Sequence, residues 1–332
     1  MAKRTAETVE IQGRELTLSN LDKVMYPETG FTKAQIIDYY VRIAPVLLPH
    51  LKGRPLTMKR YANGVQGEFF YEKNCPTHRP DWVQTTAVWS HGNNRWMDYC
   101  TIQDLPTLVW TANLASIELH TSLSLGKKIE QPTYIVFDLD PGPPADILKC
   151  CRVGLWVRDI FDKLGMKSFS KTSGSKGLQI YVPLNTAVTY DQTKPFAKTI
   201  ARILETVHPD DVVSDMKKSL RVNKVLVDWS QNDQYKTTVN VYSMRAKDRP
   251  TVSTPIEWKE VELCLKKQDP ELLVFETQDT LARVEKMGDI WEPLLKTKQK
   301  LPKLETLQEL GGSLTGTTVQ AAQTKSRRKK AA

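Results

Sequence analysis

Two aspartates stand at the end of an apolar run near the middle of the chain. The run reads PTYIVFDLDPGPP, and Asp138 and Asp140 are followed at once by Pro141 and Gly142. Side chains two positions apart in a β-strand point to the same face, so these two carboxylates would lie side by side. Adjacent like charges need a cation, and oxygen ligands favour Mg²⁺ or Mn²⁺ over zinc. For this motif alone, two exposed aspartates in a strand-end turn remain an alternative.

A third carboxylate occurs in similar surroundings farther along the chain. The stretch KVLVDWSQND predicts a short strand over 225–229, with Asp228 among apolar neighbours. A carboxylate in such surroundings is costly unless it is paired or binds a metal, and a salt bridge is the alternative. If Asp228 lies beside Asp138 and Asp140, the three could hold two cations about 4 Å apart. That arrangement is the apparatus of phosphoryl or nucleotidyl transfer.

A polar turn lies between these two carboxylate strands. The stretch SKTSGSKGLQIYVPL places two serines, a lysine and two glycines at 173–177. Backbone amides, hydroxyls and an ammonium group suit a triphosphate. The turn is not a Walker A loop, because the spacing differs and a strand follows it, and a plain hairpin is the alternative. Arg221 and Arg245 could add positive charge, and His120 could contact a phosphate or sugar. Taken alone, each arginine is more often part of a surface ion pair, and a lone histidine is more often structural.

These groups need a mixed framework to position them. Thr32 and Gln35 have the spacing of a capping box, and an apolar helical face follows from Ile36 to Leu48. Residues 54–113 are predicted to be rich in β-structure. Strands are predicted at 133–139, 167–172, 177–183, 223–229 and 237–243, and helices at 147–164, 192–207, 256–267 and 278–287.

Composition narrows the class of protein. The 332 residues, 40% of them hydrophobic, predict one large or two closely packed domains. The net charge of +9 suits a polyanionic partner such as nucleic acid without establishing one. Because the sequence has neither an apolar membrane span nor a secretory leader, we expect a soluble intracellular protein.

The cysteines and the C-terminal segment add two expectations. The five cysteines form an odd set without CxxC spacing, which favours buried free thiols in a reducing compartment over disulfides or a zinc site. Residues 298–332 have little apolar periodicity and end in a basic run, so we predict a flexible tail after a catalytic unit that spans 1–297. A solubilising role and a non-specific nucleic-acid contact are equally open for this tail.

Four separated motifs identify a family resemblance. In order, they are FDLDPG, KTSGSKGL, RVNKVLVDWSQND and YSMRA. Together they closely resemble the polymerase domain of bacterial ligase D, a member of the archaeo-eukaryotic primase superfamily that acts in non-homologous end joining. The resemblance runs from about residue 9 to residue 295. It implies an α+β primase-polymerase fold, with an RRM-like antiparallel catalytic sheet and a packed N-terminal α/β layer.

The resemblance also implies an activity and its site. The activity is nucleotide addition, commonly of ribonucleotides, at DNA ends with 3′ overhangs or gaps, with two Mn²⁺ or Mg²⁺ ions and a nucleoside triphosphate. Asp138, Asp140 and Asp228 would be the catalytic, metal-binding residues. The implied nucleotide contacts are His120, Ser173, Lys176, Arg221, Gln231 and Arg245. Gln179 stands where the superfamily usually has a histidine, so that phosphate contact is weaker or differently tuned.

Two further sets of residues match family positions near the DNA. Phe69 and Phe70 resemble the aromatic pair beside the nascent base pair, where stacking tolerates any sequence, and a core role for one of them is the alternative. Asn20, Lys23 and Lys33 fall where the family captures the 5′-phosphate across a gap. A helix N-terminus favours phosphate, although solvated surface lysines would be the simpler explanation without the resemblance.

Partners and competing functions follow from the same comparison. No ligase lysine motif or nuclease domain is present, so we expect a stand-alone polymerase that uses a separate ATP-dependent DNA ligase and the end-binding protein Ku, in the bacterial cytoplasm at the nucleoid. A non-catalytic DNA-end synapsis module is the main alternative. A phosphatase of the haloacid dehalogenase type is disfavoured, because its DxD motif lies near the N-terminus.

Overall fold

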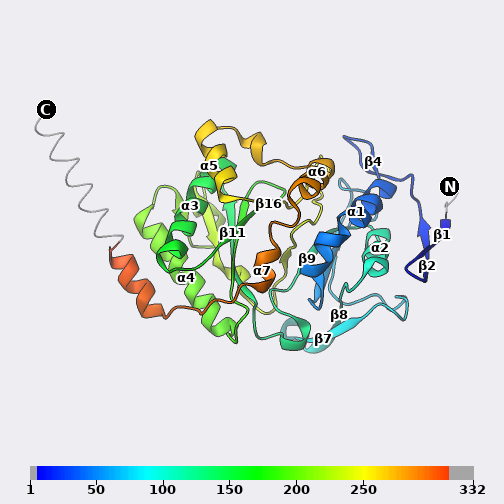
Figure 1. The fold of residues 1–332 in the computed structure, drawn as a ribbon, viewed down its shortest axis with the longest axis horizontal. Coiled ribbons are helices and arrows are strands. Elements are labelled where there is room, and N and C mark those ends of the chain that lie inside the picture. Colours follow the sequence, from blue (N-terminus) through cyan, green and yellow to red (C-terminus); the bar gives the residue numbers. More distant parts are fainter. Residues whose placement is uncertain (1–5, 314–332) are drawn as a thin grey trace, which may run out of the picture.

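The strands that carry the predicted carboxylates belong to one six-stranded sheet in the computed structural model, which describes residues 6–313 (Figure 1). The strand order is β13 (Val212–Val213), β14 (Val225–Asp228), β10 (Tyr134–Pro141), β12 (Leu178–Pro183), β11 (Phe169–Thr172) and β16 (Pro255–Ile256). All neighbouring pairs are antiparallel except β13 and β14. Apart from that pair the sheet is antiparallel, as expected, and four of its strands match predicted ones.

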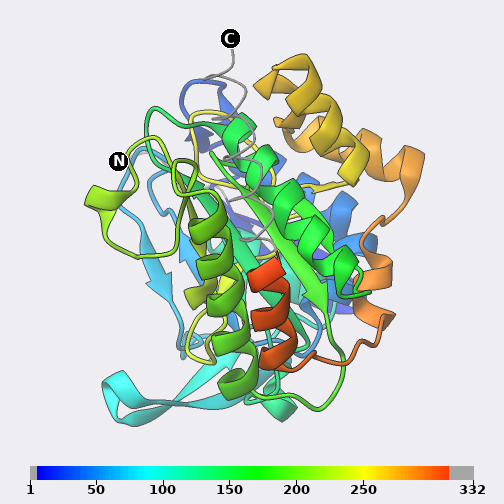
Figure 2. The same cartoon turned by 90° about the vertical axis from the view of Figure 1, so that its left-hand side faces the viewer.

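Helices cover one face of this sheet. Helices α3 (Ile147–Lys163) and α4 (Tyr190–Val207) lie side by side on it, and α5 (Trp258–Lys267) packs beside α3 (Figure 2). Ile135, Phe137 and Leu139 of β10 point toward these helices and are fully buried among them. Because side chains alternate along a strand, the even-numbered residues of β10, Asp138 and Asp140 included, face the other way.

A second six-stranded sheet forms the N-terminal half. Its order is β15 (Thr238–Val239), β9 (Ser116–Thr121), β5 (Leu56–Arg60), β8 (Arg95–Cys100) and β7 (Thr85–Ser90), and β6 (Phe70–Glu72) also pairs with β5. Helix α1 (Lys33–Leu51) packs with this sheet in one core and begins as predicted. The Thr32 hydroxyl accepts a hydrogen bond from the Gln35 amide, and the Gln35 side chain accepts one from the Thr32 amide.

The remaining elements connect or extend these two layers. They are the hairpins β1 (Ala6–Ile11)–β2 (Arg14–Ser19) and β3 (Val24–Tyr26)–β4 (Phe31–Thr32), the helices α6 (Thr277–Met287) and α7 (Glu292–Lys296), and the 3₁₀ turns η1 (His91–Asn93), η2 (Gly126–Lys128), η3 (Lys218–Leu220), η4 (Trp229–Gln231) and η5 (Pro270–Leu273). Across residues 6–313, no helix combines the length and the apolar character that a membrane crossing would need.

One helix was missed in the region predicted to be β-rich. Helix α2 (Leu105–Asn113) begins after Asp104, whose carboxylate accepts hydrogen bonds from the amide and hydroxyl of Thr107. Nearly every side chain of α2 is buried, so its sequence has no polar face and no helical period to read. The short apolar run therefore looked like a strand, and only its N-cap distinguished it.

The expected boundary at residue 297 falls too early. Residues 304–313 form a helix that lies beside α3 and α4 (Figure 2), and its Leu307 is fully buried in the core that these helices share. Gln299 joins the connecting segment to the sheet, because its side-chain amide donates to the carbonyl oxygens of Lys167 and Pro183. The prediction of a flexible tail is thus wrong for residues 298–313. The basic run at 325–330 lies outside the described residues.

The cysteine prediction is half right. Cys75 and Cys100 form a disulfide with an S–S distance of 2.03 Å, although we expected free thiols throughout. Cys150, Cys151 and Cys264 are free and buried, as expected. The disulfide joins the loop after β6 to the end of β8, so the pairing depends on the folding of the second sheet and not on a spacing that can be read from the sequence.

Candidate active site

The sheet register brings the three predicted carboxylates to one place. Asp138 of β10 lies directly opposite Asp228 of β14, and Asp140 is two residues farther along β10. Directly opposed residues in antiparallel strands share a face, as do residues two apart in one strand. Asp228 therefore shares the face of the sheet that is turned away from α3 and α4 with Asp138 and Asp140, which lie about ninety positions earlier in the chain.

The electrostatics of this cluster are unfavourable without a cation. Burial, followed by the charges of Asp140 and Asp228, raises the pKa of Asp138 to about 7, and the positive charge of Lys171 only partly opposes this rise. Burial and the charge of Asp228 also raise the pKa of Asp140. A cation at this place would remove the repulsion between the carboxylates.

Asp228 is turned toward its own strand end. Its Oδ1 accepts hydrogen bonds from the Ser230 amide at 2.8 Å and the Ser230 hydroxyl at 2.6 Å, and its Oδ2 accepts one from the Gln231 side chain at 2.9 Å. Among residues 6–313, no three or more His, Cys, Asp or Glu side chains are already arranged to hold a metal ion. The donor set still fits Mg²⁺ or Mn²⁺, because it consists of carboxylate oxygens that repel one another.

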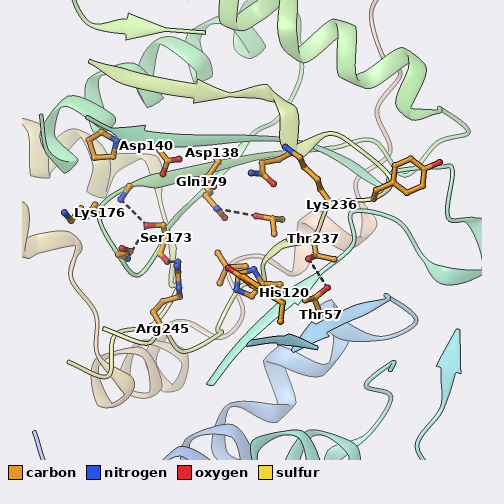
Figure 3. A pocket seen from close by; sticks show the side chains of 18 of the residues that line it. Thr57, His120, Asp138, Asp140, Ser173, Lys176, Gln179, Lys236, Thr237 and Arg245 are labelled. Atoms are coloured by element: carbon orange, nitrogen blue, oxygen red, sulfur yellow. Dashed lines mark hydrogen bonds between the residues drawn. The ribbon is translucent and has the colours of Figure 1, made fainter. Parts of the chain in front are cut away.

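A cavity of about 630 Å³ opens between the two sheets, on the face of the first sheet that carries the carboxylates (Figure 3). It is lined by Asp138 and Asp140 and by seven of the predicted nucleotide contacts: His120, Ser173, Lys176, Gln179, Arg221, Gln231 and Arg245. The first sheet supplies the carboxylates and the turn after β11, and the second supplies His120. Asp228, Phe69, Phe70 and the three predicted 5′-phosphate residues are not part of the cavity lining.

The predicted phosphate turn joins β11 to β12 at the cavity wall. The Ser173 hydroxyl accepts hydrogen bonds from the amides of Ser175 and Gly177, which holds the turn closed. A side chain at Gly177 would place its Cβ 2.2 Å from the carbonyl oxygen of Leu139, so only glycine lets the turn lie against β10. The turn thus holds Lys176 in the wall of the cavity that Asp138 and Asp140 also line (Figure 3).

Several buried polar atoms in the cavity wall make no hydrogen bond. They are Gln179 Oε1, Arg221 Nε and Arg245 Nε, all within the described residues. Other atoms of the two arginines are anchored: Arg221 donates to the Met216 carbonyl at 2.7 Å, and Arg245 donates to the Ser173 carbonyl. Arg245 Nε is still compensated by an ion pair with Glu118 at 3.3 Å. Because buried polar atoms without a partner are costly, the two others, on Gln179 and Arg221, favour a polar ligand in this cavity.

The two phenylalanines lie beside the cavity on the protein surface. Phe69 and Phe70 are 49% and 45% exposed, so neither has the core role that we kept as an alternative. Phe69 packs against the Tyr61 ring at 5.4 Å, and the Lys59 ammonium lies 4.2 Å from its ring centroid. These contacts hold an apolar face open to solvent, as base stacking requires.

The predicted 5′-phosphate residues lie together at the start of α1. The Lys33 ammonium is buried and donates to the Ser19 carbonyl at 2.6 Å and to Asn113 Oδ1 at 2.8 Å. Burial, then the charge of Lys23, lowers the pKa of Lys33 to about 8. Asn20 has a left-handed backbone, with φ of 55°. For Lys33, the alternative of a solvated surface lysine is therefore wrong.

Sequence reasoning missed two buried charged residues at this site. Lys171 lies in a cross-strand row that runs from Asp228 through Asp138 and Gln179, and its ammonium donates to the Ser253 hydroxyl at 2.5 Å. Glu118, only 1% exposed, lies between His120 and Arg245. For Glu118 a signal was present in the sequence, since a charged residue between apolar strand neighbours, here Ile117 and Leu119, needs a partner. Lys171 has the polar neighbours Ser170 and Thr172, so its burial could not be read from β11.

Comparisons with known proteins agree with this geometry. A family model for the LigD primase-polymerase domain matches residues 32–291. The chain is 39% identical over 295 residues to the multifunctional non-homologous end joining protein LigD of Mycolicibacterium smegmatis, covering 88% of this chain and 38% of that protein. It is 31% identical to the bifunctional LigD of Bacillus subtilis over 297 residues, covering 89% and 47%. The chain thus spans less than half the length of these relatives.

A solved structure extends the likeness to three dimensions. The polymerase domain from Mycobacterium tuberculosis ligase D in complex with DNA has a TM-score of 0.78 and 38% sequence identity, covering 86% of this chain and 99% of that one. The fold is therefore the predicted α+β primase-polymerase fold. From its family match and its relatives, this chain belongs to the LigD primase-polymerase domain family.

Proposed function

We propose that this protein is a DNA-end-directed nucleotidyltransferase that fills gaps and extends 3′ ends in non-homologous end joining. The observation that carries the proposal is the meeting of the Asp138, Asp140 and Asp228 strands with a phosphate-suited turn on one sheet, which faces the cavity. Family membership and the DNA-bound relative support the same function.

The proposed mechanism assigns a role to each wall of the cavity. Asp138, Asp140 and Asp228 would hold two Mg²⁺ or Mn²⁺ ions, which supply activation of a primer 3′-hydroxyl and charge neutralisation at the triphosphate. Asp228 would have to leave its Ser230 and Gln231 donors in part to do so. The Ser173 turn and Lys176 would bind the phosphates.

The arginines complete the charge balance. Arg221 Nε has no hydrogen bond in the cavity wall, and Arg245 lines the same wall with its Nε ion-paired to Glu118. Each guanidinium can donate to phosphate oxygens as negative charge builds on the departing pyrophosphate. Gln179 adds an unpaired acceptor and a weakly held amide, 3.4 Å from Thr238 Oγ1, and carries no charge. Phe69 and Phe70 would stack on the terminal bases, and Lys23 and Lys33 would receive the 5′-phosphate.

Primer extension on a gapped duplex tests this proposal. The substrate would be offered with and without its 5′-phosphate, with Mn²⁺ or Mg²⁺, and with ribo- or deoxyribonucleotides. Asp138→Ala and Asp228→Ala should each abolish extension and keep DNA binding. Asp211→Asn, a carboxylate paired with Lys149 on the helical side, is the control and should extend normally.

The outcomes separate the candidate functions. Extension by either alanine variant refutes the assignment of the carboxylates. End binding without extension by the wild-type protein, under every combination of metal and nucleotide, would favour the synapsis module instead. Association with Ku and a separate ligase is part of the proposal and is tested by adding both proteins to the end-joining reaction.

A further inference from the structure

Glu118 is a buried carboxylate surrounded by donors at the rim of the cavity. It lies on β9 two residues before His120, so both side chains point to the same face. His120 Nε2 is 2.8 Å from Oε2, and Arg245 Nε forms an ion pair with the same oxygen at 3.3 Å, without the alignment of a hydrogen bond. Oε1 accepts hydrogen bonds from the Tyr61 hydroxyl at 3.3 Å and the Ala246 amide at 3.2 Å.

This environment keeps Glu118 ionised. Burial alone would raise its pKa, but the His120 hydrogen bond and the charges of Arg245 and Lys59 hold the pKa well below its usual range. Lys59 Nζ lies 3.5 Å from Oε1. Glu118 therefore connects Arg245, which reaches the phosphate turn, with Lys59, whose ammonium lies over the ring of Phe69.

The same surroundings keep His120 neutral. Burial lowers the pKa of His120, the positive charges of Arg245 and Lys59 lower it further, and Glu118 only partly opposes them. A neutral imidazole has one nitrogen that donates and one that accepts. An ionised carboxylate can only accept, so the short contact requires the proton on Nε2.

The other nitrogen then has a defined chemistry. In the part of the chain that the structure describes, His120 Nδ1 makes no hydrogen bond, and the residue lines the cavity (Figure 3). An unprotonated Nδ1 accepts and cannot bind a phosphate oxygen, which is itself an acceptor. Thr57, which lies opposite His120 on β5, and Thr237 add a pair of hydroxyls 3.1 Å apart beside it. A cavity wall that offers an unprotonated nitrogen and two hydroxyls suits the sugar of a nucleotide, whose hydroxyl groups both donate and accept hydrogen bonds.

We propose that Glu118 is a positioning residue of the nucleotide site, which fixes the Nε2–H tautomer of His120 so that Nδ1 accepts a hydrogen bond from a sugar hydroxyl of the nucleotide. The same carboxylate anchors Arg245 toward the phosphates. This inference rests on the proposed function, and it assigns His120 to the sugar and not to the triphosphate.

Nucleotide binding by Glu118→Gln tests the proposal. Glutamine has the same size but no charge, and because it donates as well as accepts, it no longer imposes one tautomer. We expect about tenfold weaker binding of a ribonucleoside triphosphate in the presence of Mn²⁺. The 2′,3′-dideoxy analogue should be weakened less, so that the preference for the ribonucleotide narrows about fivefold. An unchanged preference would overturn the proposal.

Asp289→Asn is the matched control. Asp289 is also a largely buried carboxylate that accepts from a histidine, His50 at 2.8 Å, and from a tyrosine, Tyr242, but it does not line the cavity. Both variants should lose thermal stability, and only Glu118→Gln should change the preference between sugars. An equal change in both would mean general loosening of the fold and would count against a specific role.

A spectroscopic measurement reads the histidine ring in the wild-type protein, and a variant serves only to assign its signal. In protein labelled with ¹⁵N-histidine, the nitrogen shifts of His120 should report a neutral ring protonated at Nε2, and His120→Asn would identify the signal among five histidines. A proton on Nδ1 overturns the proposal. If the wild-type protein binds no nucleotide, the proposed function fails, and this measurement still decides whether Glu118 sets the tautomer.

Discussion

Replacing Asp138 with asparagine should stabilise the metal-free fold and abolish activity. The pKa of Asp138 rises from the ordinary 3.8 to about 7, mainly through burial and then through Asp140 and Asp228. Each tenfold increase in proton affinity corresponds to about 1.4 kcal/mol, so ionised Asp138 lowers the free energy of unfolding by at most about 4 kcal/mol. The carboxylate lines an open cavity and keeps some water, so we expect about half of this, ~2 kcal/mol.

The sign of the pH dependence follows from the raised pKa. The folded state binds the Asp138 proton more tightly than the unfolded state does. The loss of folding stability caused by ionised Asp138 is therefore absent below about pH 4 and complete above about pH 7. Urea unfolding in EDTA should therefore give equal stabilities for the wild type and Asp138→Asn at low pH. At pH 8 the variant should be more stable by ~2 kcal/mol.

Manganese should reverse this order. A cation bound by the carboxylates stabilises the wild type by mass action, and the variant lacks one ligand. The reasoning would be refuted by a variant that is less stable than the wild type at pH 8 in EDTA, or by a difference that does not change with pH. Asp211→Asn, which removes a carboxylate already paired with Lys149, should show no gain.

Three further predictions concern other parts of the molecule. Burial lowers the pKa of Lys33 to about 8, so the increase in gap filling that a 5′-phosphate gives should fade as the pH rises through about 8. Lys33→Met should remove this pH dependence. If the pH dependence persists in that variant, Lys33 does not bind the 5′-phosphate. Gly177→Ala forces a Cβ to 2.2 Å from a β10 carbonyl and should cost about 1–3 kcal/mol in thermal unfolding, whereas Gly92→Ala, with open space, should be neutral. Reducing the Cys75–Cys100 disulfide should lower the free energy of unfolding by about 3 kcal/mol. The stability of Cys100→Ser should not change with reductant. An equal effect of reductant on the wild type and on Cys100→Ser would contradict this prediction.

Much of the catalytic sheet could be predicted because its signals are local. The alternation around Asp138 and the glycine-containing turn at 173–177 each follow from a few neighbouring residues. The α1 start was equally readable, since the capping box at Thr32 lies within four residues. Such features need only the period of the backbone and the chemistry of adjacent side chains.

The features that could not be predicted depend on contacts between distant segments. The disulfide of Cys75 with Cys100 requires a loop and a strand to meet, and the buried role of Glu118 requires Arg245 to come from a segment 127 positions later. Family resemblance indicated that Asp228 joins the other carboxylates, but not that its oxygens bond to Ser230 and Gln231. Local patterns do not specify which oxygen faces which donor.

The opposition of β10 and β14 also protects the fold against mispairing. Asp228 lies opposite Asp138 on the cavity side, while Val225 and Val227 of the same strand are fully buried beneath the helices. A slip of β14 by a single residue would exchange these faces and drive a charged group into the apolar layer, while valines would enter the wet cavity. An isolated carboxylate there costs several kcal/mol, so misaligned pairings are sparsely populated. The acidic residue that the chemistry requires is thus also the one that makes the correct strand alignment unique.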